Sequence, residues 1–209
     1  MTNDVEIIRV LVADDHPVMR SGLKAVICEQ PDMRLVGVAG DGAECITEFD
    51  RLLPDVTLLD LQMPKVDGLQ AITAIRSKYP QAAIVVLTTY PGDVRVTRAL
   101  NLGAISYLLK QTSVEEIVDA IRGASEGRQV IDSDVAKEIA AHKGSESLTI
   151  RELSVLRLVA QGKSNREISD ALYLTEDGIK ARMRAILLKL EASDRTHAVT
   201  IAMRRGFLD

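Results

Sequence analysis

The stretch "RVLVADDHPVMR" (residues 9–20) joins a short apolar run to two adjacent aspartates, Asp14 and Asp15. The run is rich in β-branched residues and short enough to be a buried strand. Two neighbouring carboxylates at the end of such a strand repel each other. A lone pair in this position most often caps a helix, so the ends of the other strands decide whether these two residues do more.

Four further apolar runs follow, and a stretch with helical periodicity comes after each run. The strands are predicted at 7–13, 33–39, 56–60, 83–88 and 105–109. The helices are predicted at 17–29, 42–52, 67–79, 93–102 and 113–125, the last with a capping box from Ser113 and Glu116. This alternation predicts an α/β domain, a five-stranded parallel sheet with helices on both faces.

The second half of the chain contains no proline after Pro91 and is predicted to be mostly helical. Residues 1–126 form the predicted first domain, and the polar segment 127–147 is a linker with a helix near 132–142. Residues 148–209 form a second, all-α domain with helices at about 150–161, 165–171, 176–191 and 195–205. The motifs "TIRE" and "SNRE" are capping boxes that mark the first two of these helices.

The composition, with 46% hydrophobic and 27% charged residues, is that of an ordinary soluble globular protein. No apolar run can span a bilayer and the N-terminus lacks an export signal, so we expect a cytoplasmic protein without membrane contact. Cys28 and Cys45 lack metal-ligand spacing and are expected to be buried thiols. Residues 1–147 carry 15 Lys and Arg against 22 Asp and Glu, a charge of −7, whereas 148–209 carry 11 against 8, a charge of +3. The asymmetry indicates two units with different partners and permits nucleic-acid binding by the second.

Chemically useful side chains stand at four strand ends: Asp14 and Asp15, then Asp60, Thr88 and Lys110. Open parallel sheets bind ligands at the carboxyl ends of their strands, so these groups converge if the four strands are neighbours. Converging carboxylates favour Mg²⁺, and a carboxylate can also be a nucleophile that becomes an acyl-phosphate. Lys110 and Thr88 are suited to phosphoryl oxygens. Each residue alone is more often a capping, loop or solvated group, and only their joint occurrence favours a site.

The segment "GKSNREISDALYLTEDGIKARMRAILLKL" (162–190) has the spacing of a helix-turn-helix motif. Its long helix has one apolar face that must pack, formed by Ile179, Met183, Ile186, Leu187 and Leu190. The outward side carries Lys180, Ala181, Arg184 and Leu188. Lys180 or Arg184 could reach guanine, and the small Ala181 allows close approach or contact with a thymine methyl. Asn165, Arg166 and the helix start at Thr175 are suited to phosphates. The alternative is a small helical bundle with a charged surface.

Several of these motifs together resemble a known family. The stretches "VLVADDHPVMRSGL", "PDVTLLDLQMPKVDGL", "VVLTT" and "GAISYLLK" resemble the receiver domain of bacterial two-component response regulators. The tail, residues 148–206, resembles the LuxR-type helix-turn-helix of the NarL/FixJ subfamily. The resemblance covers nearly the whole chain except the linker, and it implies a flavodoxin-like, doubly wound receiver followed by a four-helix DNA-binding domain.

The resemblance also implies roles for individual residues. Asp60 would accept a phosphoryl group from a sensor histidine kinase in a Mg²⁺-dependent step. Asp15 would ligate Mg²⁺ directly, Asp14 mainly through water, and Gln62 through its backbone carbonyl. Lys110 would pair with the phosphoryl group, Thr88 would hydrogen-bond it, and Tyr107 would be the switch aromatic. Pro64 and Gly68 would shape the loop after Asp60.

Phosphorylation in this family would alter association into a homodimer and binding to double-stranded promoter DNA. The last helix has an apolar stripe that could form the dimer contact of the DNA-binding domain, consisting of Ala198, Ile201 and Ala202. The chain departs from the family pattern at Ser106, usually Gly, and at Gly178, Ala181 and Arg182 in the recognition helix. These departures predict altered packing around Tyr107 and an unusual DNA target.

Two other functions compete with this one. The first is a Mg²⁺-dependent phosphatase or phosphotransferase with Asp60 as nucleophile, but such enzymes commonly place an acid–base carboxylate two residues later, where this chain has Gln62. The second is a phosphorylation-independent DNA-binding or adaptor protein, which would not need the full set of strand-end residues. The chain is therefore predicted not to be an enzyme, apart from phosphorylation and dephosphorylation of its own Asp60.

Overall fold

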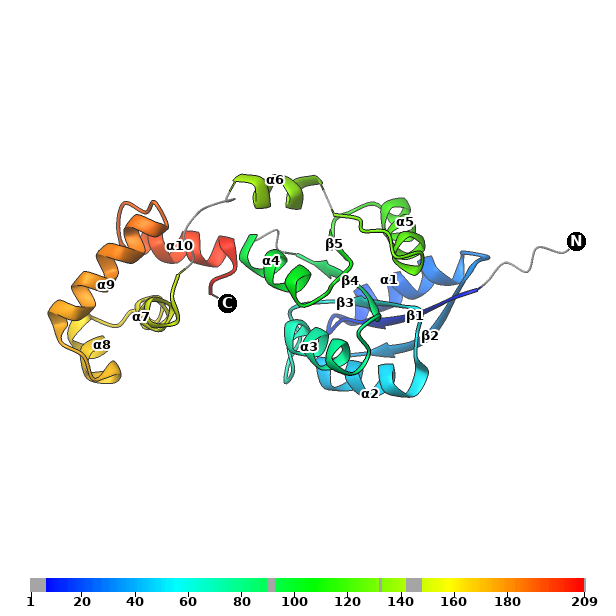
Figure 1. Cartoon of the computed structure of the whole chain (residues 1–209), viewed down its shortest axis with the longest axis horizontal. Coiled ribbons are helices and arrows are strands. Elements are labelled where there is room, and N and C mark those ends of the chain that lie inside the picture. Colours follow the sequence, from blue (N-terminus) through cyan, green and yellow to red (C-terminus); the bar gives the residue numbers. More distant parts are fainter. Residues whose placement is uncertain (1–6, 90–92, 132, 142–147, 209) are drawn as a thin grey trace, which may run out of the picture. The chain divides into compact units, whose positions relative to one another are not determined.

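The protein is described by a computed structural model that covers residues 7–89, 93–131, 133–141 and 148–208. The chain divides into an N-terminal α/β unit and a C-terminal helical unit (Figure 1). Parts of the predicted linker, residues 132 and 142–147, lie outside the described residues. Within the described part, no helix has the length and apolar character needed to cross a bilayer.

The N-terminal unit is built on a five-stranded sheet of order β2-β1-β3-β4-β5, and every pairing in it is parallel. The strands are β1 (Ile8–Ala13), β2 (Met33–Ala39), β3 (Val56–Leu59), β4 (Ala83–Thr88) and β5 (Ser106–Leu109). The chain order reverses between β1 and β3, which makes their carboxyl ends the switch point of the sheet. The predicted doubly wound parallel sheet is confirmed, and strands 1, 3, 4 and 5 are neighbours as the site requires.

Helices cover both faces of the sheet. They are α1 (Pro17–Cys28), α2 (Gly42–Leu52), α3 (Gly68–Lys78), α4 (Asp93–Asn101) and α5 (Val114–Ser125). Helices α1 and α5 pack on one face, and α2 and α3 lie on the other (Figure 1). The right-handed crossover rule places α4 with α2 and α3. The predicted capping box at Ser113 is confirmed, because its side chain accepts from the backbone N–H of Glu116 and Glu116 bonds back to the Ser113 N–H.

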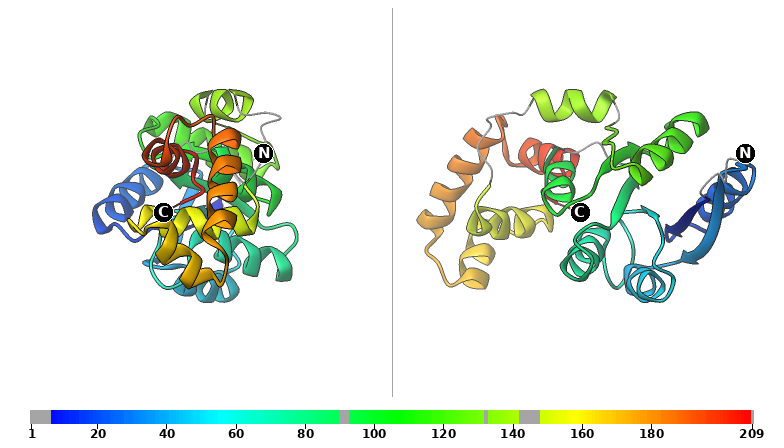
Figure 2. Two further views of the ribbon diagram at one scale, coloured as in Figure 1. Left: turned by 90° about the vertical axis from the view of Figure 1, so that its left-hand side faces the viewer. Right: turned by 45° about the vertical axis from the view of Figure 1, so that its right-hand side comes forward.

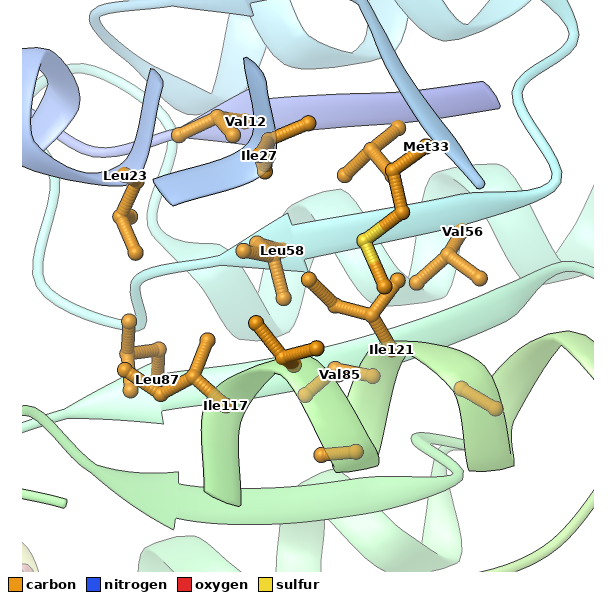
Figure 3. Packing of buried hydrophobic residues seen from close by; sticks show 14 of the residues in the cluster. Val12, Leu23, Ile27, Met33, Val56, Leu58, Val85, Leu87, Ile117 and Ile121 are labelled. Atoms are coloured by element: carbon orange, nitrogen blue, oxygen red, sulfur yellow. The ribbon is translucent and has the colours of Figure 1, made fainter. Parts of the chain in front are cut away.

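The main core lies between the sheet and helices α1 and α5 (Figure 3). Leu58 of β3 is 1% exposed, and Ile27 and Ile121 approach it from the two helices without any exposure. Burial of each such side chain stabilises the fold by about 2 kcal/mol. Cys45 is also buried as predicted, but Cys28 is exposed, because it occupies the last turn of α1 on the side away from the core.

The segment after α5 continues onto the free edge of β5. The backbone N–H of Tyr107 donates to the carbonyl of Val130, and Tyr107 forms a parallel bridge with Ile131. The buried hydroxyl of Ser106 accepts from the backbone N–H of Val130 at 2.9 Å. Ser106 therefore anchors this segment, which explains structurally why a hydroxyl stands where the family usually has glycine. A further helix, α6 (Ser133–Ala141), follows within the predicted linker.

The C-terminal unit consists of α7 (Ile150–Ala160), α8 (Asn165–Leu172), α9 (Glu176–Lys189) and α10 (Arg195–Arg205). Figure 2 shows α8 leading through a tight turn into the longer α9. Capping boxes begin α7 at Thr149 and α8 at Ser164, as predicted. Four helices around one apolar cluster confirm the expected all-α domain.

One prediction for this unit is wrong. The sequence suggests that the apolar stripe of α10, formed by Ala198, Ile201 and Ala202, could form a dimer contact. The structure buries these residues in the core of their own unit, with exposures of 0%, 8% and 0%. A four-helix domain this small needs each helix to contribute its apolar face to a single core. The exposed side of α10 instead presents Met203.

Candidate functional site

The carboxyl ends of β1, β3, β4 and β5 bring the strand-end residues to one edge of the sheet. The backbone N–H of Asp60 donates to the carbonyl of Ala13 at 2.8 Å, and that of Lys110 donates to the carbonyl of Thr88 at 2.7 Å. These bonds extend the sheet by one residue beyond the strands. Each functional side chain therefore starts from a backbone position that its neighbouring strand fixes.

Lys110 lies between two buried carboxylates. Its Nζ is 2.7 Å from Oδ2 of Asp14 and 2.7 Å from Oδ2 of Asp60. The side chains of Lys110, Asp14 and Asp60 are 10%, 2% and 3% exposed. One ammonium thus offsets two carboxylates in a place from which water is largely excluded, and the three groups carry a net negative charge.

Asp15 and His16 complete the acidic edge. Oδ1 of Asp15 is buried and accepts no hydrogen bond, although Nδ1 of His16 lies 2.7 Å from it. Ligand atoms from Asp14, Asp15, His16 and Asp60 all lie within 4.8 Å of one another. An orphaned carboxylate oxygen beside two further carboxylates fits a hard divalent cation such as Mg²⁺.

The electrostatics of the pocket are dominated by burial. Burial raises the pKa of Asp60, and the hydrogen bond from Lys110 lowers it only in part, so the net pKa is above its ordinary value. Burial lowers the pKa of Lys110, but its hydrogen bonds to Asp14 and Asp60 outweigh this, and the net pKa is raised. Lys110 therefore stays charged, while the carboxylate of Asp60 is less stable than a carboxylate in water.

The loop after Asp60 is held close to the site. Oδ1 of Asp60 accepts from the backbone N–H of Gln62 at 3.1 Å, and the N–H of Gly68 donates to the carbonyl of Leu61 at 3.0 Å. A Cβ on Gly68 would lie only 2.3 Å from the carbonyl oxygen of Asp60. Any larger residue at position 68 would therefore push the loop away from the acidic edge.

Thr88 and Tyr107 line the neighbouring part of the sheet. Thr88 ends β4 and is 1% exposed, and Tyr107 is the largest side chain in the described residues that is fully buried. Tyr107 therefore points inward from β5, and Lys110 directly follows the end of this strand. Its backbone is fixed on both sides, by β4 and by the segment after α5.

The outward face of α9 in the C-terminal unit is polar and open. Lys180, Ala181 and Arg184 are exposed, whereas Ile179 and Ile186 on the opposite face are completely buried. A long helix with an exposed basic stripe, preceded by a short helix and a tight turn, has the form of a helix that enters the major groove of DNA.

The start of α9 explains two departures from the family pattern together. Thr175 is the N-cap, and its hydroxyl accepts from the backbone N–H of Gly178 at 3.1 Å. Arg182 donates to the carbonyl of Gly178 at 3.2 Å, and a Cβ at position 178 would lie 3.4 Å from its guanidinium. The missing side chain at Gly178 leaves room for Arg182. Asn165 and the exposed Arg166 form the first turn of α8.

Two contacts were not predicted from the sequence. Lys180 is already paired with Asp177 at 2.9 Å, so Lys180 must leave the Asp177 carboxylate before it can bind an acceptor atom of DNA. Lys189 of α9 reaches Glu152 of α7 at 3.0 Å, and both side chains are largely buried. The capping box "TIRE" identified Glu152 as a local cap, but nothing local indicated that it also joins two helices.

Comparison with known proteins agrees with both units. Residues 10–122 match the family model for the response regulator receiver domain, and residues 146–202 match that for bacterial regulatory proteins of the luxR family. The transcriptional regulatory protein LiaR of Bacillus subtilis is 42% identical over 210 residues, covering 97% of this chain and 100% of LiaR. The response regulator protein VraR of Staphylococcus aureus is 38% identical over 206 residues, covering 96% and 99%.

Solved structures show the same architecture. The response regulator ChrA of a heme-sensing two-component system is similar over 97% of this chain and 100% of its own, with 32% identity and a TM-score of 0.58. RcsB, solved as two dimers bound to two parallel DNAs, shares the fold at 24% identity, with a TM-score of 0.71 over 95% and 98% of the two chains. The family so defined regulates transcription and is not an enzyme family. The chain belongs to the two-component response regulators of the NarL/LuxR type, DNA-binding transcriptional regulators with a receiver domain and a LuxR-type helix-turn-helix domain.

Proposed function

We propose that Asp60 accepts a phosphoryl group from a sensor histidine kinase in a Mg²⁺-dependent step, and that this modification controls DNA binding. The observation that carries the proposal is Lys110, held at 2.7 Å from both Asp14 and Asp60 in a pocket that retains negative charge. Such a pocket attracts a cation, and Lys110 is close enough to Asp60 to pair with a phosphoryl oxygen once Asp60 is modified.

The acidic residues divide naturally between direct and indirect roles toward Mg²⁺. Asp14 is occupied at both oxygens, since Oδ1 accepts from the backbone N–H of His16 and Oδ2 pairs with Lys110. Asp15 offers an oxygen without a hydrogen bond. The free oxygen supports direct ligation by Asp15, with Asp14 acting mainly through water. Both oxygens of Asp60 are also engaged, by the N–H of Gln62 and by Lys110, so its direct ligation, together with that of the backbone carbonyl of Gln62, rests on the resemblance to receiver domains and requires Asp60 to exchange one of these partners. Bound Mg²⁺ would offset charge on the phosphoryl oxygens.

The chain's own residues then carry the switch. An oxygen of Asp60 attacks phosphorus, and the bond from phosphorus to the donor breaks. The ammonium group of Lys110, which pairs with Asp60 before the reaction, then pairs with a phosphoryl oxygen. Thr88 donates its hydroxyl to another phosphoryl oxygen, and Tyr107 moves with it. Because Tyr107 is buried in β5, its movement would alter the surface made by α4, β5 and α5.

The output is a change in self-association and DNA binding. We assign residues 1–126 to the receiver, 127–147 to a linker and 148–209 to the DNA-binding domain of a cytoplasmic protein that forms a homodimer when phosphorylated. Lys180, Ala181 and Arg184 would read base edges of double-stranded promoter DNA. Asn165, Arg166 and the N-terminus of α9 at Thr175 would contact phosphates.

The receiver part is tested with the native chain and Asp60→Asn, each incubated with Mg²⁺ and acetyl phosphate or beryllofluoride. With acetyl phosphate the native chain should gain the mass of one phosphoryl group. With either reagent it should form more dimer and bind DNA more tightly, and the variant should do none of these. An unchanged native chain would refute the switch. Hydrolysis of small phosphate esters faster than modification of Asp60 would instead revive the enzyme alternative.

The DNA contacts are tested with Lys180→Ala combined with Arg184→Ala. The matched control is Arg157→Ala with Arg204→Ala, which removes the same charge from exposed positions on α7 and α10. Only the first pair should abolish sequence preference in a selection from random DNA fragments. Arg166→Ala should weaken binding to all sequences alike and flatten the salt dependence by about one unit. Equal loss of preference in both double variants would contradict the placement of α9.

A further inference from the structure

The histidine next to the paired aspartates has no part in the function proposed so far. His16 is the N-cap of α1, yet its side chain makes no capping hydrogen bond. Its Nδ1 lies 2.7 Å from Oδ1 of Asp15 and 3.3 Å from Oδ1 of Asp14. The ring is therefore turned toward the acidic edge instead of toward the helix that it begins.

We propose that Nδ1 of His16 is a nitrogen ligand of the same cation site, so that this receiver also takes a first-row transition cation. The proposal rests on the proposed Mg²⁺ pocket and extends the range of cations that the pocket accepts. The class meant is Fe²⁺, Co²⁺, Ni²⁺ and Zn²⁺, which bind imidazole well, whereas Mg²⁺ prefers oxygen.

The geometry favours shared coordination over a simple hydrogen bond. Oδ1 of Asp15 remains without a hydrogen-bond partner even though Nδ1 of His16 is 2.7 Å away, so the two atoms do not point at each other as donor and acceptor. Two ligands at about 2.1 Å from an octahedral cation lie about 3 Å apart. The separation of 2.7 Å from Nδ1 of His16 to Oδ1 of Asp15, the direct carboxylate ligand, is close to that value.

The position of His16 also leaves it free to act as a ligand. Its side chain is 66% exposed, so the ring can adjust toward a cation without disturbing the core. The neutral imidazole has one lone pair, and Nδ1 can direct it at the cation while Nε2–H faces solvent. With the carboxylates of Asp15 and Asp60 and one imidazole as direct ligands, the site combines hard and borderline ligands.

The test uses the native full-length chain, His16→Ala and His197→Ala, with Co²⁺ and Mg²⁺ as probes. His197 is an exposed histidine of the C-terminal unit and serves as the matched control. Calorimetry should show Co²⁺ affinity falling about tenfold or more in His16→Ala, with Mg²⁺ affinity changed less than about twofold. In the proton NMR spectrum of the Co²⁺-loaded chains, the native chain and His197→Ala should share hyperfine-shifted imidazole ring C–H signals that His16→Ala lacks.

Each outcome separates this proposal from the one on which it rests. Equal Co²⁺ affinity in all three chains, or an imidazole signal that survives in His16→Ala, overturns the role of His16 and leaves Mg²⁺-dependent modification of Asp60 standing. Loss of Mg²⁺ and Co²⁺ affinity together in His16→Ala also overturns it, because that residue would then be needed for the fold of the pocket. Failure of the native chain to bind either cation overturns both proposals.

Discussion

Replacing Lys110 with alanine should destabilise the receiver far more than the loss of an ordinary surface charge. Lys110 is the cation at 2.7 Å from both Asp14 and Asp60, whose side chains are 2% and 3% exposed. Lys110→Ala leaves two carboxylates facing each other in a place that water hardly reaches. Breaking a buried ion pair by removing one partner costs about 3–5 kcal/mol, and we expect a loss of unfolding free energy in this range at pH 7.

The pH dependence of the variant follows from the raised pKa of Asp60. Burial already raises this pKa, and removal of Lys110 removes a group that lowers it. A carboxyl group whose folded pKa lies above its unfolded value stabilises the fold at low pH, and this contribution is lost as the pH rises through the folded pKa. The deficit of Lys110→Ala should therefore shrink as the pH falls from 7 toward 5.

A cation should replace the lost ammonium. Mg²⁺ at ten times its dissociation constant stabilises the folded state by about 1.4 kcal/mol, and Lys110→Ala should bind Mg²⁺ more tightly than the native chain does. The assay is urea denaturation followed by circular dichroism, with hydrogen exchange of peptides from β1 and β3 to assign the transition to the N-terminal unit. Each chain is measured with and without Mg²⁺.

The matched control is Lys78→Ala. Lys78 pairs with Asp50 at 2.9 Å, nearly the same distance, but the two side chains are 60% and 41% exposed. Water screens this pair, so its loss should change unfolding much less. The reasoning is refuted if the two variants lose equal stability, or if Mg²⁺ and acidification fail to recover any of the loss in Lys110→Ala.

Three smaller predictions concern single contacts. Glu152→Gln should lower the free energy of unfolding by about 1–2 kcal/mol, because it weakens a helix cap and a largely buried pair with Lys189. Burial raises the pKa of Glu152, but its hydrogen bonds outweigh this and leave the pKa lowered. The stability difference between the native chain and the variant should therefore shrink below about pH 4.5 in acid denaturation. Ser106→Ala should cost about 1–2 kcal/mol and speed amide exchange at Val130, whose N–H loses its acceptor; unchanged exchange would contradict the anchoring role. Gly178→Ala should gain less than the roughly 1 kcal/mol that alanine usually adds over glycine in a helix, since its Cβ would lie 3.1 Å from the N-cap hydroxyl of Thr175 and 3.4 Å from Arg182; a gain of the full amount in thermal unfolding would show that both neighbours shift without cost.

The fold could be predicted from the sequence because its signals are local and repeated. Apolar runs and helical periods alternate five times, and three capping boxes mark helix starts that the structure confirms. The strand-end residues could be named because a parallel sheet brings its carboxyl ends to one edge. Hydrophobic pattern and backbone geometry are sufficient for this level of description.

Contacts between distant segments could not be predicted in the same way. The stripe of Ala198, Ile201 and Ala202 is apolar whether it packs inside the unit or against a partner, and only the arrangement of the four helices shows that it is buried. The link from Glu152 to Lys189 joins residues 37 apart, and the sequence shows only that Glu152 can cap its own helix. His16 was visible beside the aspartates, but the direction of its ring depends on the turn into α1.

The segment that pairs with β5 has a practical consequence for anyone dividing the protein into fragments. An exposed edge strand offers unpaired backbone groups to other chains and invites aggregation. Here Val130 and Ile131 cover the edge at Tyr107, and the hydroxyl of Ser106 holds them there. A receiver fragment that stops at residue 126 would lose this cover and should aggregate, whereas a fragment that continues through α6 should remain monodisperse.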